Sequence, residues 1–340
     1  MKKYLLPNEN SFFKANMHTH TTVSDGKMTP EEIKQTYVNA GYSIVAFTDH
    51  EVIANHGHLS DDRFLAITAY EYAVNEICEG IPREFLKTYH LNLFSKVPQK
   101  TDYRVFSVDH ANLFEKGRQY IPKQMEERRY PSSYSTASVN ELIRIANEEG
   151  FLVSLNHPTW SLQDHEDYAD LHGLWGVELY NTACVNMGYT DTPVPLDTLL
   201  RKGEKPFPLA TDDAHSIGDC HGGWLMVSAE KLEYTAVMSA LEKGNFYAST
   251  GPEIKEISFE DGKLTVRTSE AVGISVSTDR RASYFKRSKD GALIGEAVFD
   301  LSRYVNNCAL RNTPHYVRVT VRDREGRQAW SRAYFLDELN

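Results

Sequence analysis

The chain has 340 residues, 41% of them hydrophobic and 25% charged, and a formal net charge of −10 at pH 7. This composition is that of an ordinary globular protein, and the length accommodates one large α/β domain with a smaller one beside it. A net negative charge does not favour binding to nucleic acid or to an acidic membrane surface, so we expect neither as the main partner.

The cysteines and the N-terminal segment indicate the cellular compartment. The apolar run after Met1 ends at Pro7, too early for a signal peptide, and no stretch approaches the roughly 20 apolar residues of a membrane span. The four cysteines are far apart and form no Cys-x-x-Cys pair, which argues against a disulfide framework and a thiolate zinc site. They are Cys78, Cys184, Cys220 and Cys308. We therefore expect a cytoplasmic protein.

Residues 16–26 form a short extended stretch that contains two histidines. Side chains alternate between the two faces of a strand, so His18 and His20 project from the same side, where they can grip one divalent cation. Asp25 follows in a Ser-Asp-Gly turn, in which a loop can fold a carboxylate back over the strand end. This stretch therefore supplies part of a candidate metal site.

Fully apolar runs of strand length recur along the chain, and most of them carry polar side chains at one end. Such runs are typical of strands buried in a parallel sheet, which deliver functional groups at their C-terminal ends. The predicted strands are 43–48 with Asp49 and His50, 64–69 with Glu71, 89–94 with His90, 151–155 with His157, 176–181 with Glu178, and 207–211 with Asp213 and His215.

Helical patterns lie between several of these strands. Thr29 and Pro30 predict a helix start, and Gly41 predicts its end. Further helices are expected over 138–150, where Ser138 and Glu141 suggest a capping box, and from about residue 228 to 243. Seven strands alternating with helical or inserted segments indicate an α/β fold, a parallel barrel that is incomplete or distorted.

The composition changes after Gly251 and Pro252. Residues 263–267, 272–277 and 316–322 alternate polar with apolar side chains between turn signals, as in a small antiparallel β-sandwich. We therefore expect a barrel domain over 1–252 and a C-terminal β-sandwich domain over 253–340.

The candidate metal ligands share a position near predicted strand ends and would meet at one mouth if the strands form a barrel. They are His18, His20, Asp25, His50, Glu71, His90, His157, Asp213 and His215. A mixture of imidazole and carboxylate without thiolate suits zinc, manganese or iron. Asp49 and Glu178 lie beside these ligands and are expected either to orient imidazole N–H groups or to serve as ordinary buried hydrogen-bonding groups.

Together these motifs resemble the PHP (polymerase and histidinol phosphatase) family, in its subgroup with a C-terminal β-domain. The resemblance covers about residues 14–252 and rests on His18-x-His20, Ser24-Asp25-Gly26, Thr48-Asp49-His50, Glu71, His90, Asn156-His157-Pro158 and Asp213-Ala214-His215. It implies a distorted seven-stranded (β/α) barrel that holds two or three divalent metal ions and hydrolyses phosphoesters.

The resemblance also implies how the ligands divide. His18, His20, Glu71 and Asp213 would hold one metal, Glu71 would bridge to a second held by His90 and His157, and Asp25, His50 and His215 would hold a third. Two bridged cations would share a water of lowered pKa, giving a metal-bridged hydroxide as nucleophile. Glu71, Asp213 and His215 are the residues expected to act most directly in catalysis.

The expected substrate is a small phosphorylated molecule such as a nucleotide or sugar phosphate. Residues 95–135 form an irregular, charged insertion, typical of a lid or helical insertion, from which Arg104, Arg118 and Arg128 could clamp a phosphate or could simply be solvated charges. One alternative is hydrolysis of an amide or carboxylic ester at the same metals. Another is a carbohydrate- or ligand-binding protein with a relict metal site.

Overall fold

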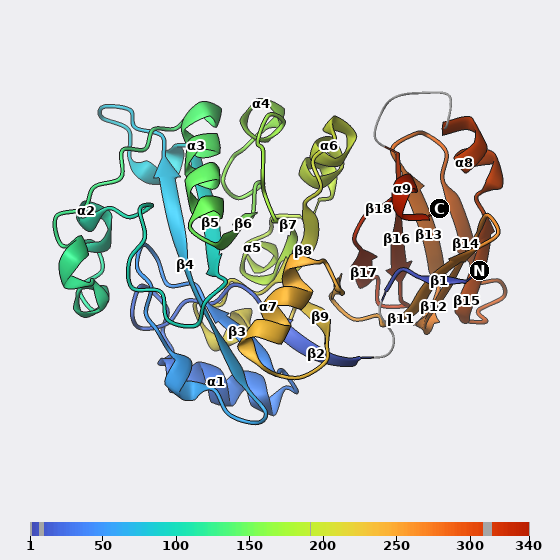
Figure 1. Cartoon of the computed structure of the whole chain (residues 1–340), viewed down its shortest axis with the longest axis horizontal. Helices are drawn as coiled ribbons and strands as arrows, with labels where there is room; N and C mark the ends of the chain where they lie inside the picture. The colour runs from blue at the N-terminus through green and yellow to red at the C-terminus, as the bar shows by residue number, and fades with distance from the viewer. Residues whose placement is uncertain (1, 7–9, 191, 309–314, 340) are drawn as a thin grey trace.

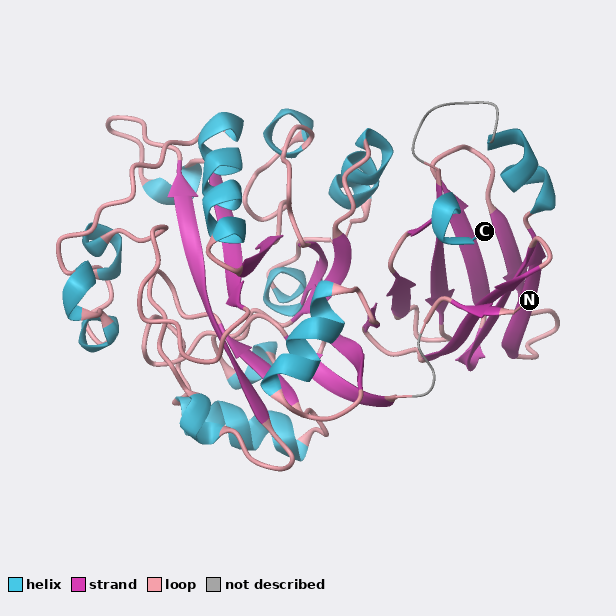
Figure 2. Cartoon of the chain, in the orientation of Figure 1, coloured by secondary structure: helices cyan, strands magenta, loops and turns pink. Residues whose placement is uncertain are grey.

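The computed structural model describes residues 2–6, 10–190, 192–308 and 315–339. Figure 1 shows a larger part, which contains a twisted sheet and most of the helices, beside a smaller part of antiparallel strands in which both chain ends lie. Figure 2 shows that helices surround the strands of the larger part. Among the described residues, no helix is both long and apolar enough to cross a membrane.

Seven strands of the larger part follow one another across the sheet in chain order. They are β2 (Ser11–Asn16), β3 (Ile44–Phe47), β4 (Leu65–Asn75), β5 (Thr88–Ser95), β6 (Phe151–Leu155), β7 (Gly176–Asn181) and β8 (Phe207–Thr211). The strands β2, β3 and β4 are parallel to one another, and so are β6, β7 and β8. The strand β5 is antiparallel to both of its neighbours.

The all-parallel arrangement expected from the sequence is therefore wrong at β5. A parallel crossover needs a dozen or more residues and usually an α-helix. The segment between β4 and β5 contains only a short 3₁₀ turn at Arg83–Phe85, so the chain returns directly as a hairpin. The predicted α/β class is confirmed.

The two outer strands of this series, β2 and β8, meet where they end. An isolated bridge pairs Thr19 with Ala214, and the amide of His20 donates to the carbonyl of Ala214 over 3.0 Å. In the described ranges no longer ladder joins β2 to β8, because β2 also pairs with β9 (Trp224–Ala229). Closure into a barrel stays a prediction, but the ends of β2 and β8 do meet.

The helices of the larger part correct two predicted starts. Thr29 caps α1 (Pro30–Asn39) with a capping box to Glu32, as expected. The cap of α3 (Thr136–Glu148) is Ser135 rather than Ser138, because the Ser135 hydroxyl accepts the amide of Ser138. The helix expected from residue 228 is α7 (Tyr234–Glu242), since β9 occupies 224–229. The remaining helices are α2 (Val108–Ala111), α4 (His165–Tyr168), α5 (Thr182–Asn186) and α6 (Val194–Lys202).

The smaller part pairs two antiparallel groups of strands around their own core, in agreement with the predicted alternation. One sheet contains β1 (Lys3–Tyr4), β11 (Ile254–Glu260), β12 (Lys263–Ala271) and β15 (Ile294–Asp300). The other group contains β13 (Gly273–Thr278), β14 (Tyr284–Arg287), β16 (Tyr316–Arg322), β17 (Gln328–Ser331) and β18 (Tyr334–Phe335), and β10 (Phe246–Ser249) connects it to β9. Short helices α8 (Ser302–Cys308) and α9 (Leu336–Leu339) complete it.

The N-terminal residues pack with this smaller part. The strand β1 pairs with β11, and Leu5 and Leu6 lie in the same hydrophobic core as Ile257 and Val319. We propose a domain division near residue 252, with residues 3–6 assigned to the C-terminal unit.

An ion pair between a buried arginine and a partly exposed aspartate joins the two parts. Nη2 of Arg318, on β16, lies 3.0 and 3.1 Å from the two carboxylate oxygens of Asp197 on α6, and Arg318 is only 3% exposed. A buried guanidinium that loses its partner carboxylate keeps the cost of desolvation without the compensating charge.

We predict that Asp197→Asn lowers the free energy of unfolding by about 3 kcal/mol, because Arg318 would be left buried and unpaired. Chemical denaturation measures this change. The matched control is Asp170→Asn, which breaks the exposed pair between Asp170 and Lys202 and should leave the denaturation midpoint unchanged. Equal effects of the two substitutions would contradict a structural role for the Arg318 pair.

Candidate metal centre

All nine predicted ligands converge on one region. Their ligand atoms form overlapping groups within which all atoms lie within 4.8 Å of one another. The groups are His18, His20 and Asp213; His18, Glu71 and His157; His50, Glu71 and His90; and His20, Asp25, His50 and His215. Residues up to 195 positions apart in the sequence thus face each other, as strand-end placement predicted.

Two ligands reach this region differently from the way the sequence suggested. Glu71 lies within β4 rather than at its end, because β4 continues to Asn75. His90 lies near the start of β5, and the antiparallel direction of β5 brings that start beside Ala73, close to Glu71. Because β5 runs antiparallel to β4 and β6, its first residues lie beside the C-terminal ends of these two strands.

Glu71 is the centre of the cluster. Its Oε1 lies 3.3 Å from His18 Nε2, 3.2 Å from His90 Nδ1 and 3.4 Å from His157 Nε2. Its Oε2 lies 3.1 Å from His50 Nδ1 and 3.5 Å from His20 Nε2. Burial alone would raise the pKa of this carboxyl, but the charges of His90, His18 and His50 outweigh burial and hold the pKa well below its usual range.

The atoms around Asp213 fit a divalent cation. Asp213 Oδ1 lies 3.2 Å from His18 Nε2 and 3.1 Å from His20 Nε2, and these two ring nitrogens are 3.1 Å apart. Asp213 Oδ1 is buried and makes no hydrogen bond of good geometry. Two imidazole nitrogens and a carboxylate oxygen that point at one another form the donor set that a cation satisfies.

Hydrogen bonds on the outer side of the imidazoles favour this use. His18 Nδ1 lies 2.7 Å from Glu178 Oε1, which places the proton on Nδ1 and leaves the Nε2 lone pair for a metal. In the same way, His157 Nδ1 lies 3.1 Å from the Ser161 hydroxyl, and its Nε2 faces Glu71.

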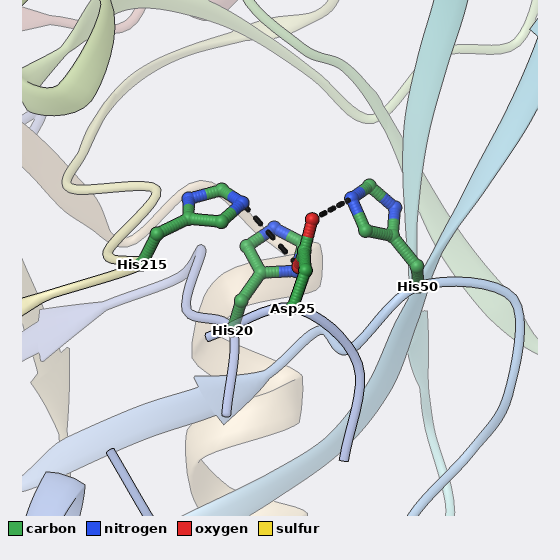
Figure 3. Close-up of side chains that lie close together, drawn as sticks. All are labelled: His20, Asp25, His50 and His215. Carbon is green, nitrogen blue, oxygen red and sulfur yellow. Dashed lines mark ion pairs between the residues drawn. The ribbon is translucent and has the colours of Figure 1, made fainter. Parts of the chain in front are cut away.

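The third group surrounds Asp25 (Figure 3). Asp25 Oδ1 lies 3.6 Å from His20 Nδ1 and 3.5 Å from His215 Nε2, and Oδ2 lies 3.5 Å from His50 Nε2. Burial and the charge of His20 lower the pKa of His50 to about 3. Burial opposes charging of His215 as well, but its hydrogen bond with Asp25 and the charge of Asp213 raise its pKa to about 10. The two histidines beside the Asp25 carboxylate therefore differ in proton affinity, which is low for His50 and high for His215.

The two carboxylates expected to orient imidazoles have different roles. Glu178 contacts His18 directly, and its Oε2 accepts the amide of His157 and the Asn181 side chain, each over 3.0 Å. Asp49 instead accepts the backbone amides and hydroxyls of Thr21 and Ser24 over 2.7–3.2 Å. Asp49 thus shapes the loop that carries Asp25 and is not an imidazole partner in this structure.

Asn156 is a site residue to which the sequence assigned no function. Its side-chain amide donates to Glu71 Oε1 over 2.7 Å and its Oδ1 accepts the Ser154 hydroxyl. The available signal was its position directly before His157, in the Asn-His-Pro motif.

Backbone strain also concentrates here. Glu51, His157 and Asp213 adopt positive φ angles of 67°, 28° and 52°, which cost energy in residues with a side chain and occur at functional sites.

A pocket of about 480 Å³ opens beside the cluster. It is lined by Asp25, His50 and His90 together with side chains that the sequence did not single out, among them Arg83, His110, Phe114, Trp160 and Tyr189. The ring of Phe114 stacks on that of His50, with centroids 5.3 Å apart and an angle of 15°.

The three arginines predicted to bind substrate do not line this pocket. Arg104 pairs with Glu148 and Glu149, Arg128 pairs with Asp102, and Arg118 donates to the carbonyl of Asn112. Their assignment as phosphate clamps finds no support in these contacts. The arginine that reaches the pocket is Arg83, from the β4–β5 hairpin.

The comparisons with known proteins agree with the motifs. The PHP domain family model matches residues 16–154, which confirms the resemblance to that family. A search of curated proteins found no match. Similar solved structures include a two-domain protein from Bacteroides vulgatus ATCC 8482 that contains a predicted PHP-like metal-dependent phosphoesterase, with 13% identity, 98% of this chain and 97% of that chain covered, and a TM-score of 0.44.

Two further structures are similar over part of the chain. An amidohydrolase from Chromobacterium violaceum has 14% identity, with 59% of this chain and 87% of that chain covered and a TM-score of 0.36. The lesion-specific endonuclease EndoQ from Pyrococcus furiosus has 17% identity, with 68% and 56% covered and a TM-score of 0.39.

We predict that Glu178→Gln weakens metal binding about 10- to 100-fold, because the amide no longer holds His18 in the tautomer that exposes Nε2. Titration of the metal-free protein with zinc or manganese measures the affinity. The matched control is Glu204→Gln, since Glu204 Oε1 lies 2.9 Å from Nδ1 of the exposed His172, away from the cluster. Unchanged affinity in Glu178→Gln would show that its contact with His18 does not tune the site.

Proposed function

We propose, from the PHP match and the geometry around Glu71, that this chain is a metal-dependent phosphoesterase acting on a small phosphorylated molecule such as a nucleotide or sugar phosphate. The observation that carries the proposal is one buried carboxylate whose two oxygens lie 3.1–3.5 Å from five imidazole nitrogens. A carboxylate in this setting can bridge two cations, and bridged cations are a recurring device of phosphoester hydrolysis.

The proposed ligand sets are those that the family resemblance implies. His18, His20, Asp213 and Glu71 would hold one divalent ion, and Glu71, His90 and His157 a second. In the groups of facing atoms, Glu71 and His157 lie with His18, and Glu71 and His90 lie with His50. Asp25, His50 and His215 would hold a third, with His20 close enough to contribute. The nitrogen and oxygen donors suit zinc, manganese or iron.

Bound divalent ions would supply positive charge opposite a phosphoryl group and a nucleophilic water of lowered pKa. The protein keeps its donors ready for them. The low pKa of Glu71 keeps this carboxylate ionised, and Asn156 donates to Glu71 Oε1. Glu178 fixes the tautomer of His18, and Ser161 holds the ring of His157 in place. Ligands held in this way need little rearrangement when an ion binds.

The pocket supports a small substrate. Its volume of about 480 Å³ lies within the range of small-molecule sites, and Phe114, Trp160 and Tyr189 offer flat surfaces to a base or a sugar ring. Arg83 is placed to meet an anionic group at the rim.

We predict that His20→Ala lowers p-nitrophenyl phosphate turnover by at least about 100-fold and reduces bound metal, because His20 lies in two of the ligand groups. Metal analysis and steady-state kinetics measure the two effects. The matched control is His172→Ala, whose ring is exposed and bonded to Glu204, and it should retain both activity and metal.

Treatment with a chelator should abolish the same activity, and added zinc, manganese or iron should restore it. A parallel panel of amide and carboxylic ester substrates separates the proposed reaction from hydrolysis at a carbonyl carbon. Activity on esters or amides with none on phosphoesters would overturn the proposal. Full phosphatase activity in metal-free protein would overturn it as well.

A further inference from the structure

The inserted segment before α3 places a histidine at the mouth of the metal cluster. His110 lies on α2 and lines the same pocket as Asp25, His50 and His90. Its side chain is 37% exposed, so one part of the ring is open to the pocket and another is covered. Among the described residues, His110 belongs to none of the groups of facing ligand atoms.

The covered part of the ring faces a buried carboxylate. Glu51 is 4% exposed, and its Oε2 lies 3.6 Å from His110 Nδ1. The same oxygen is buried and has no hydrogen bond of good geometry, and the His110 imidazole is the ion-pair partner that faces it. An ionised oxygen in this position is costly unless a positive or proton-donating group faces it.

Glu51 is held firmly in this position. Its backbone amide donates to the carbonyl of Glu71 over 2.7 Å, and its Oε1 accepts the amide of Ala73 over 3.1 Å. Its φ of 67° is unfavourable for a residue with a side chain. The strained residue is thus the one whose carboxylate faces His110. We interpret Glu51 as a positioning residue for His110.

We propose that His110, positioned by Glu51, is a catalytic residue that donates a proton to the leaving-group oxygen of a phosphomonoester bound in this pocket. The inference rests on the proposed phosphoesterase function and adds a role for the insertion. Because Nδ1 faces Glu51, Nε2 is the nitrogen left to meet the substrate.

The phosphorus–oxygen bond to the leaving group breaks, its electron pair stays on the leaving oxygen, and that oxygen takes the Nε2 proton of His110. A bond forms between phosphorus and the oxygen of water, which loses a proton to solvent. The products are an alcohol and inorganic phosphate, and neutral His110 regains its proton from solvent.

The charges around His110 favour the protonated ring. The closeness of Glu51 outweighs partial burial and raises the pKa of His110, and Asp109 on the same helix acts in the same direction. Arg83 of the β4–β5 hairpin lowers it, while the Tyr72 ring on β4 lies 5.9 Å away. The acid form therefore persists to higher pH than in an ordinary histidine, whose pKa is about 6.5.

The test compares two substrates that differ in their need for an acid. A p-nitrophenolate ion leaves without a proton, whereas the alkoxide of 2-glycerophosphate does not. In His110→Gln, kcat/KM for 2-glycerophosphate should fall at least about 100-fold, and that for p-nitrophenyl phosphate less than about 10-fold. The matched control is His165→Gln, which changes an exposed histidine on α4 and should affect neither substrate.

The pH dependence gives a second readout. Activity on 2-glycerophosphate should fall as pH rises through the pKa of His110, because the protonated form acts, and Glu51→Gln should move this fall to lower pH. In proton NMR spectra, the ring signal missing from His110→Gln should titrate above pH 6.5 in the wild type and lower in Glu51→Gln. Both measurements use the full chain.

Several results would overturn the inference. Equal losses on the two substrates, or no loss on 2-glycerophosphate, would remove His110 as the proton donor while the wild-type activity upholds the phosphoesterase. Normal titration of His110, unaffected by Glu51→Gln, would remove Glu51 as its positioning residue. A wild-type protein that hydrolyses neither substrate with added metal would overturn the proposed function and this inference together.

Discussion

Compensation of charge around Glu71 is the constraint on which the site depends. A carboxylate at 1% exposure, with Asp213 and Glu178 close by, is far too costly to bury without positive charge among these groups. The imidazoles provide it by holding protons or cations. Burial opposes charging of His18, yet Asp213, Glu178 and Glu71 raise its pKa well above the usual range. Burial likewise opposes ionisation of Asp213, but His18, His20 and His215 lower its pKa. Proton binding to these imidazoles therefore competes with cation binding.

The surrounding fold makes this arrangement rigid. Glu178 and Asp49 are themselves buried carboxylates, and each accepts several hydrogen bonds from backbone amides, hydroxyls or an imidazole. Their hydrogen bonds connect the loops after β2 and β6 with the last residue of β8, Thr211. The strained backbone at His157 and Asp213 persists because these contacts, and the apolar core beneath the strands, over-determine it. Ligand geometry therefore derives from the packing of the whole sheet rather than from the loops alone.

The sequence was informative about which residues meet and less so about how they meet. Strand-length apolar runs and the polar residues beside them identified the positions of His50, His157 and Asp213, because burial on both faces leaves a clear pattern. The same pattern is identical for a parallel and an antiparallel strand, so the direction of β5 could not be read from it. The partners of Arg104 and Arg128 depend on tertiary contacts with Glu148 and Asp102, which no local pattern encodes.

The insertion forms a wall of the pocket and is anchored in the hydrophobic core. Its Tyr103, Val105, Phe106, Val108, Ala111 and Met125 belong to the main hydrophobic core. The Tyr103 hydroxyl accepts the amide of Ile53, and the Tyr70 hydroxyl donates to the carbonyl of Val105. Withdrawal of the segment would expose these side chains, at about 1.5–3 kcal/mol for each large one. The segment that seats Phe114 against His50 also seats His110 against Glu51, so the same packing positions a candidate metal ligand and the pocket wall. The position of this wall is therefore set by side chains of the hydrophobic core.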